Sequence, residues 1–394
     1  LMAARKIMGS PLAMPLSMPP ALLVSVPMLW ATVHVLFASS AWLYLSLPGD
    51  REMCAELDGQ EGVHWFSRDQ EPFSAADVVL FGEGRYIAAS SKVWHDAFLG
   101  KLFSDGLEHR VLIFSTEPGM DFAGRTVQAE LPWHLMPQFI LPDTQGNLVV
   151  TLIGHDGQHA LGVIRNPKTK GAQFDEFVYL PPDILANGLV EHQGRWVAID
   201  VRRDILWYDP LSLKLVDRWV PPTYVSSFGP EMMMDFDMAD AQNLYISTLG
   251  SRIFAFNLGE KKGRMTHDLG GPGSGVDGFG TTGALLGADI GRHRLRLFQD
   301  DGLELEVVRE VALDFGPRPV RAAPNLGMVF VGDYVGGAVR AYRLETLEPV
   351  GEGVQVGGNL RRLRYHPQSK TLYSASKCGV FKIDPIRAFA SRPD

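Results

Sequence analysis

The stretch VFVGDYVGGAVRAYRLETLEPV, residues 329–350, decides the fold of this chain. It predicts a strand at 329–332, a tight Gly-Gly turn, a second strand at 338–344 and a third strand at its end. Alternating apolar residues separated by glycine-rich turns are typical of a short antiparallel meander. A single meander cannot bury both faces of its sheet, so we expect the chain to repeat this unit.

Similar units of apolar strands and turns recur along the chain. They occupy residues 77–115, 137–166, 186–220, 235–258, 277–311, 329–350 and 360–384. Recurrence at roughly 30 to 50 residues is the sequence sign of a β-propeller. The chain is therefore predicted to be all-β and to form a seven-bladed β-propeller. The spacing of the units is uneven, which leaves a six-bladed ring as the alternative.

The last unit shows only three strands, and no fourth strand follows Pro385. The segment VHWFSRD, residues 63–69, precedes the first unit and has no other obvious partner. We expect it to be the outer strand of the seventh blade, because this pairing closes the ring and removes an exposed sheet edge. The least repeat-like segments, 93–108 and 118–135, are predicted to be surface loops or short helices.

The N-terminal residues differ in composition from the rest. No charged residue occurs between Lys6 and Asp50, and the apolar run at 20–47 is long enough to cross a membrane, which takes roughly 20 helical residues. We expect a retained transmembrane anchor, with cleavage as a signal peptide near Ala38 as the alternative. Positive charge before the run places the N-terminus on the cytoplasmic side and the propeller on the extracytoplasmic side, periplasmic or lumenal.

These patterns divide the chain into five predicted parts. They are an N-terminal tail at 1–19, a transmembrane anchor at 20–48, a linker at 49–62, the propeller at 63–385 and a C-terminal tail at 386–394. The expected protein is thus a single-pass membrane protein.

The chain has two cysteines, Cys54 just after the anchor and Cys378 in the last unit. Closure of the ring by residues 63–69 would bring both ends of the propeller together. We therefore expect a Cys54–Cys378 disulfide, which an oxidising compartment would allow, with two free thiols as the alternative.

The formal net charge of −8 argues against a nucleic-acid partner, because binding a polyanion needs a basic face. No cluster of Lys and Arg offers such a face. The charge thus directs attention to protein partners or small ligands.

Particular stretches resemble known propeller families. ANGLVEHQGRWVAID at 186–200, followed by DILWYDP, looks like the NHL, YVTN and SMP-30 group, and residues 329–350 resemble a YVTN-type repeat. The front half is more loosely similar to the paraoxonase/arylesterase family. That similarity rests on the apolar N-terminus, Cys54, SAADVVLFGEGRYIAASS at 74–91, and the stretches MPQFILPD, VVTLIGHDG and ILANGLVE.

The paraoxonase-like resemblance implies a calcium site on the inner strands, because that family holds Ca²⁺ with Asn, Asp and Glu. Asn187 and Asp277 stand at two such positions, and Asp77 is a weaker third candidate. Ala76 occupies the position of another expected carboxylate, and Gly278 follows Asp277. Calcium takes six to eight oxygen ligands, so the site that the sequence offers is incomplete.

The same resemblance implies a histidine pair as the catalytic base. His155 matches one member of the pair, but Gln138 stands at the other position and cannot act as a general base. His155 and His159 could instead bind a metal, but no third His or Cys is near them in sequence, so a solvated loop is the favoured interpretation.

Two functions follow from these observations. The first is a membrane-anchored, non-catalytic binding or assembly module, an accessory subunit that contacts other membrane-complex subunits through its loops and its transmembrane helix. The alternative is a calcium-dependent lactone or aryl-ester hydrolase with a divergent site, in which Asn187, Asp277, Asp77 and His155 converge. The depleted catalytic positions favour the first, and fold-level similarity alone does not decide.

Overall fold

The computed structural model describes residues 49–390, except residues 71–72, 92–108, 117–126, 133, 155–156, 170, 223–224, 227–228, 251, 267–268, 270, 280–282 and 303. The chain divides into two units, Leu1–Leu45 and Ser46–Asp394, and every described residue belongs to the second. The described part contains no helix that is both long and apolar enough to cross a membrane. The predicted anchor at 20–48 lies outside the described residues and stays a prediction.

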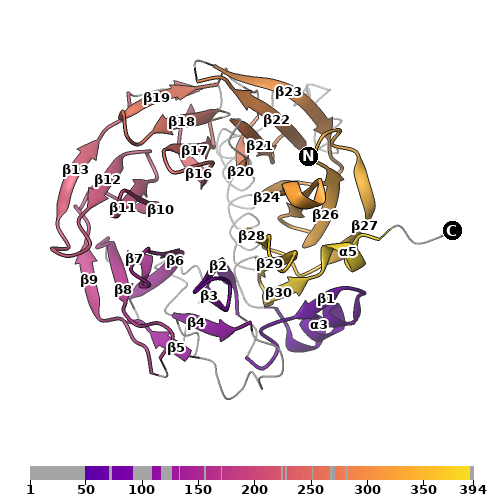
Figure 1. Ribbon diagram of the computed structural model, residues 1–394, viewed down its shortest axis with the longest axis horizontal. Helices are drawn as coiled ribbons and strands as arrows, with labels where there is room; N and C mark the ends of the chain where they lie inside the picture. Colours follow the sequence, from indigo (N-terminus) through magenta and orange to yellow (C-terminus); the bar gives the residue numbers. More distant parts are fainter. Residues whose placement is uncertain are drawn as a thin grey trace, which may run out of the picture. The chain divides into compact units, whose positions relative to one another are not determined.

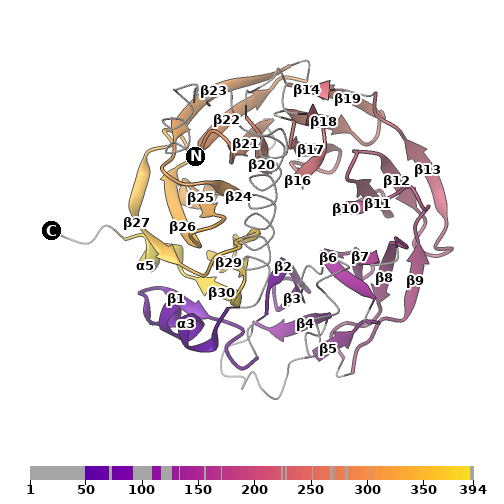
Figure 2. The ribbon, with the colours of Figure 1, turned by 180° about the vertical axis from the view of Figure 1, so that it is seen from behind.

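Seven four-stranded antiparallel sheets make up the described part of this second unit, and they form the blades of a ring (Figure 1). Figure 2 shows the same ring from behind. The prediction of an all-β, seven-bladed β-propeller is confirmed. A six-bladed ring is thereby excluded.

The strands, from the axis outward, are β2 (Ala75–Phe81), β3 (Tyr86–Ser91), β4 (Arg110–Ser115) and β5 (Val127–Glu130) in blade 1; β6 (Leu135–Pro142), β7 (Leu148–Gly154), β8 (Ala160–Ile164) and β9 (Glu176–Tyr179) in blade 2; β10 (Ala186–His192), β11 (Arg195–Asp200), β12 (Ile205–Tyr208) and β13 (Leu215–Trp219) in blade 3; and β16 (Met233–Met238), β17 (Asn243–Thr248), β18 (Ile253–Asn257) and β19 (Lys262–Met265) in blade 4. Blades 3 and 4 are joined by a segment that contains the short pair β14 (Val225–Ser226) and β15 (Gly229–Pro230).

The remaining strands are β20 (Gly273–Phe279), β21 (Ala284–Asp289), β22 (Arg294–Asp300) and β23 (Leu305–Ala312) in blade 5; β24 (Pro317–Ala323), β25 (Met328–Asp333), β26 (Ala338–Arg343) and β27 (Pro349–Gln355) in blade 6; and β28 (Arg362–His366), β29 (Thr371–Ser376), β30 (Gly379–Ile383) and β1 (Val63–Trp65) in blade 7. Short helices are α3 (Arg51–Glu56), η1 (Leu57–Gly59), η3 (Pro324–Leu326) and α5 (Pro385–Ala388).

Residues 329–350 form β25, β26 and the start of β27, close to the predicted bounds. The inner strand of this blade, β24, precedes the stretch that revealed the repeat. Gly337 has a φ of 77° in the tight turn. A Cβ there would lie 2.3 Å from the carbonyl carbon of Gly357, so only glycine fits the turn.

The ring closes between its first and last strands, as predicted. β1 pairs with β30 in the register Val63↔Ile383 and Trp65↔Phe381, so the indigo strand lies beside the yellow ones in Figure 1. The Trp65 indole Nε1–H also donates to the Cys378 carbonyl oxygen at 2.8 Å. The pairing removes the free edge of β30, because a three-stranded last blade would leave it unpaired.

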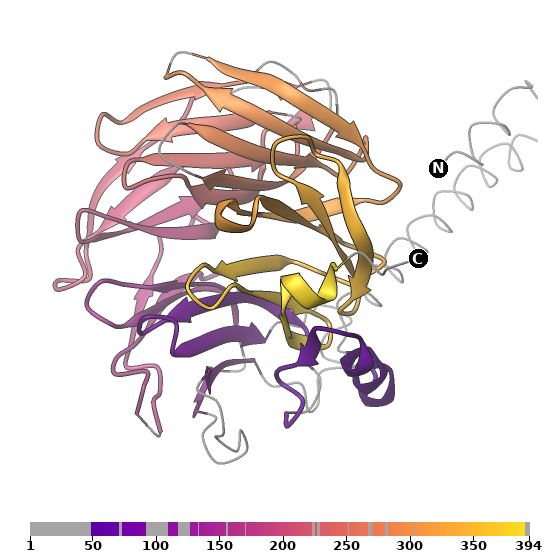
Figure 3. The same cartoon turned by 45° about the vertical axis from the view of Figure 1, so that its right-hand side comes forward.

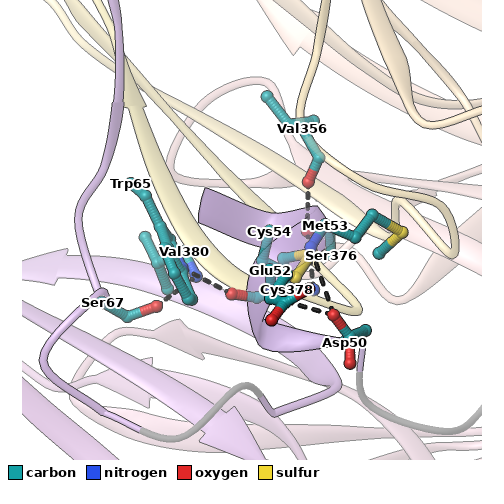
Figure 4. Close-up of a disulfide and its surroundings, with 10 residues drawn as sticks. All are labelled: Asp50, Glu52, Met53, Cys54, Trp65, Ser67, Val356, Ser376, Cys378 and Val380. Atoms are coloured by element: carbon teal, nitrogen blue, oxygen red, sulfur yellow. Dashed lines mark hydrogen bonds between the residues drawn. A yellow bond between two sulfur atoms is a disulfide. The ribbon is translucent and has the colours of Figure 1, made fainter. Parts of the chain in front are cut away.

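A disulfide joins Cys54 to Cys378 beside this closure (Figure 4). The predicted Cys54–Cys378 bond is therefore confirmed. Cys54 lies in α3, whose N-cap is Asp50: its carboxylate accepts hydrogen bonds from the backbone N–H groups of Glu52 and Met53. Both cysteines are fully buried. Figure 3 shows the C-terminal helix α5 near α3. The Asp384 N–H, just before α5, donates to the Gly62 carbonyl oxygen at 2.7 Å.

Apolar side chains from neighbouring blades pack against each other between the sheets. One cluster, for example, combines Val197 and Trp207 of blade 3 with Phe236 and Phe254 of blade 4. Blades 5 and 6 approach each other closely at Gly275 in β20, where a Cβ would lie only 1.8 Å from the Arg318 carbonyl oxygen of blade 6. The core of the protein is therefore distributed around the ring between its blades.

One predicted loop is in fact part of a blade. The segment 118–135 was expected to contain only loops or short helices, but β5 lies within it and pairs with β4 in the register Val111↔Ala129. Ala129 is fully buried against blade 2. This packing stabilises the strand, although the local sequence VQAE has little β-propensity. Tertiary packing thus overrides the local pattern here.

Candidate functional site at the ring axis

The start of each inner strand determines which side chains reach the axis. Register shifts occur near the start of six of the seven inner strands, β28 being the one without a shift. A bulge re-aims the side chains that follow it. In β2 and β16 the residue after the shift is an aspartate, Asp77 and Asp235 respectively. Acidic side chains are thereby placed at the axis from two distant blades.

The first layer of this site is centred on Arg362, the first residue of β28. Its guanidinium Nη1 pairs with Asp235 Oδ1 of blade 4, and its Nε lies 3.4 Å from Asp77 Oδ1 of blade 1. The rings of Phe139 and Phe236 lie 4.9 and 5.0 Å from the same guanidinium carbon, the geometry of cation–π contacts. One buried arginine thus connects blades 1, 2, 4 and 7.

The second layer lies two residues further along the inner strands. Arg321 Nη1 is 2.5 Å from Asp277 Oδ1 and 3.3 Å from Asp237 Oδ2. Arg364 Nη1 lies 3.8 Å from Asp237 Oδ1, and its Nη2 lies 3.8 Å from Asp77 Oδ1. Asp77 therefore joins the two layers, and Asp237 links Arg321 to Arg364 within the second layer. We call these residues the axial cluster: Asp77, Asp235, Asp237, Asp277, Arg321, Arg362 and Arg364.

The aspartates of the axial cluster also bind the backbone of the next blade. The Ile140 N–H donates to Asp77 Oδ2 at 3.0 Å, and the Ala322 N–H donates to Asp277 Oδ2. Asp235 and Asp237 accept in the same way from the backbone of β20, at Val276 (3.4 Å) and Gly278 (3.2 Å). Each carboxylate therefore satisfies a backbone donor while it holds two blades together.

Burial and charge shift the pKa values of these carboxyl groups in different directions. Burial raises the pKa of Asp235, and the positive charge of Arg362 opposes this effect. Burial raises the pKa of Asp277 well above its usual value, and the negative charge of Asp237, with which it shares a hydrogen bond, adds to the shift. For Asp237 burial is again the largest influence, but Arg321 and Arg364 outweigh it and lower the pKa. Asp277 is therefore the member of the pair with the higher pKa.

The predicted site residues do not all share one environment. Asp77 and Asp277 belong to the axial cluster, whereas the Asn187 Nδ2 group donates to the Met233 carbonyl oxygen at 3.4 Å and takes no part in the cluster's ion pairs. His155 lies outside the described residues. The assignment of Asn187, Asp277 and Asp77 as calcium ligands stays a prediction, as does the role of His155.

The chemistry of the axial cluster fits a bound cation poorly. The Asp77 and Asp277 oxygens already face guanidinium groups, which repel Ca²⁺ and compete for the same lone pairs. Within the described residues, no group of three or more His, Cys, Asp or Glu side chains has the arrangement to hold a metal ion. The arrangement is suited to rigid ionic cross-linking of blades rather than to coordination.

Sequence reasoning missed the arginines of this site. Arg362 and Arg364 alternate in LRRLRYH, as Asp235 and Asp237 do in MDFDM, so each pair lies on one face of its strand. Charged residues that alternate on buried inner strands are an observable signal. The resemblance to a calcium-binding family drew attention to Asn, Asp and Glu only, and so the cationic partners were overlooked.

These features define the class of the protein as a closed seven-bladed β-propeller with an ionic cluster at its axis. A scan against protein-family models found no match, and a search of curated proteins found none. The YVTN, NHL, SMP-30 and paraoxonase resemblances therefore remain hypotheses based on short stretches.

Proposed function

We propose that this protein is a membrane-anchored binding and assembly module, an accessory subunit that presents a rigid propeller on the extracytoplasmic side of a membrane. The observation that carries the proposal is the axial cluster. Arg362 is 4% exposed and pairs with Asp235 and with Asp77, which the paraoxonase-like resemblance offers as a calcium ligand. An axis filled by ion pairs stiffens the disc and leaves its loops as the surfaces for partners.

The cellular placement rests on two further features. The apolar run at 20–47 supports an anchor. The buried Cys54–Cys378 disulfide supports an oxidising compartment for the ring, since such bonds are rare where thiols are kept reduced. With the N-terminus cytoplasmic, the ring would then lie in the periplasm or a lumen.

The placement can be tested with an engineered glycosylation acceptor. None of the asparagines lies in an Asn-x-Ser/Thr sequence, so the native chain provides a clean background. Gly259→Thr would create an acceptor at Asn257, and a Cβ at position 259 has ordinary space around it. Translated into microsomes, this variant should gain one glycan, and Gly259→Ala should gain none. A chain that is inserted but never glycosylated would contradict a lumenal ring.

The assembly role can be tested by cross-linking the full chain in native membranes, followed by solubilisation, purification and mass spectrometry. The matched control is residues 1–48 fused to an unrelated domain, which retains the apolar run and lacks the ring. We expect partner membrane proteins whose cross-links map to propeller loops, and we expect the control to lose them. Recovery of the full chain alone, or of the same partners with the control, would contradict the proposal.

A further inference from the structure

Two arginines near the axis differ from those of the axial cluster. Arg318 lies in the irregular start of β24, and Arg361 immediately precedes β28, so both stand at the end of the ring where the inner strands begin. The guanidinium carbon of Arg318 lies 4.7 Å from the centre of the Tyr334 ring, and Arg361 interacts with the Tyr334 hydroxyl. We call Arg318 and Arg361 the arginine pair.

The arginine pair has no carboxylate within ion-pair distance, although Asp235 of the axial cluster acts on Arg318 at longer range. Each arginine of the axial cluster faces at least one aspartate within ion-pair distance, whereas in the described part of the chain neither Arg318 nor Arg361 forms an ion pair. Burial lowers the pKa of Arg361 to about 10, and the positive charge of Arg318 adds to this effect. Two neighbouring cations that lack a directly paired carboxylate repel each other, and a bound anion would relieve this repulsion.

The surroundings hold Arg361 in one orientation. Its Nε–H donates to Asn359 Oδ1 at 3.0 Å, and the Asn359 Nδ2 group donates to Ser74 Oγ at 3.1 Å. Asn359 is fully buried and Tyr334 is 9% exposed, so both supports are fixed by packing. The remaining N–H donors of the Arg361 guanidinium group can therefore bind a ligand. Preorganised guanidinium groups bind the planar or tetrahedral oxygens of carboxylates and phosphates particularly well.

The overall negative charge of the protein distinguishes the arginine pair from a generally basic surface. With a formal net charge of −8, the chain repels anions at long range, so a local pair of unneutralised arginines is not part of a generally basic surface. An anion that binds here must therefore do so through direct contacts.

We propose that the arginine pair, together with the Tyr334 hydroxyl, forms an oxyanion-binding site between blades 6 and 7. Its ligand is a phosphate or carboxylate group, whether free or carried by a small molecule. The proposal is independent of the assembly role, because it rests on contacts within the ring and on no membrane partner. A propeller that serves no membrane complex would still bind the anion.

The test is anion-dependent stabilisation of the full-length chain purified in detergent. Inorganic phosphate, acetate and, as a salt control, chloride are titrated at constant ionic strength, while the apparent Tm is followed and phosphate binding is measured by calorimetry. At a roughly 20-fold excess over Kd, phosphate should raise the apparent Tm by about 2–3 °C. Stabilisation by phosphate alone indicates a phosphoryl ligand, and stabilisation by acetate as well indicates a carboxylate ligand.

Three variants separate this site from general ionic effects. Arg361→Gln and Arg318→Gln should each lose the phosphate response. Arg340→Gln should keep it, because Arg340 stacks on Phe315 in the same blade but is paired with Asp314 on the surface. Without anion, Arg361→Gln should fold with an apparent Tm no lower than the wild type, since it removes a partly buried charge that has no ion-pair partner. Arg318→Gln is the second readout if it does not. No response in the wild type, or an equal response in both arginine-pair variants, would overturn the site.

Discussion

Removal of Arg362 is the sharpest perturbation of the axial cluster. Arg362→Gln keeps a polar side chain but leaves Asp77 and Asp235, which are 1% and 9% exposed, without their shared cation. Breaking a buried ion pair by removing one partner costs about 3–5 kcal/mol. A ring of this size has an unfolding entropy of about 0.7 kcal/mol/K, so the apparent Tm should fall by about 4–7 °C.

The effect of Arg362→Gln should depend on pH in a defined direction. The folded pKa of Asp235 is already raised by burial and is held down in part by Arg362, so the variant raises it further. A carboxyl group with a raised folded pKa contributes stability below its usual pKa and loses it as pH rises through the folded value. The deficit of the variant should therefore be larger at pH 7.5 than at pH 4.5, by on the order of 1–2 kcal/mol.

The assay is denaturation of wild type and variant in parallel at both pH values, followed by circular dichroism and tryptophan fluorescence. Arg340→Gln is the matched control, because its ion pair with Asp314 is solvent-exposed and should contribute less than about 1 kcal/mol. An Arg362→Gln chain as stable as the wild type, or one with the same deficit at both pH values, would refute the reasoning.

Three further predictions concern the closure of the ring and its contacts between blades. Replacing Cys54 and Cys378 with serine, or reducing their bond, should lower stability by about 2–5 kcal/mol because the bond spans 324 residues, and urea denaturation with and without reductant measures this; equal curves would contradict it. Gly275→Ala should cost about 3 kcal/mol, since its Cβ would meet a carbonyl oxygen at 1.8 Å, whereas Gly259→Ala, with no neighbour closer than 3.5 Å, should be neutral in the same denaturation experiment. Asp277→Asn should change stability at low pH by less than about 1 kcal/mol and should remove the loss of wild-type stability that begins as pH rises above about 4, because the folded pKa of Asp277 is raised well above its usual value; an unchanged pH profile would contradict the raised pKa.

The architecture could be predicted from the sequence because it depends on local signals. Alternating apolar residues and turn glycines such as Gly337 mark the strands of most blades independently of one another. The closure of the ring by residues 63–69 could also be predicted, because the last unit lacks a fourth strand and only one segment is free to supply it. β5 was missed because its burial against blade 2, and not its own sequence, makes it a strand.

The axial cluster could not be assembled from the sequence in the same way. Arg362 and Asp235 are separated by 127 residues and meet only because their blades face each other across the axis. Strand patterns place a residue on a face, but they do not tell which faces of distant blades come within ion-pair distance. Asp77 and Asp277 were recognised as axial candidates, yet the cations that neutralise them became visible only in the folded ring.

The central claim is that the carboxylates at the axis form ion pairs with guanidinium groups and are therefore not available as calcium ligands. On this claim, the propeller acts by binding rather than by calcium-dependent catalysis. The most direct measurement is elemental analysis of calcium in the purified full-length chain after equilibration with Ca²⁺ and removal of the excess, with lactone and aryl-ester turnover assayed on the same sample. We predict substoichiometric calcium and no turnover above that of buffer. One calcium per chain, with turnover that Asn187→Ala abolishes and the surface control Asn325→Ala retains, would contradict the claim.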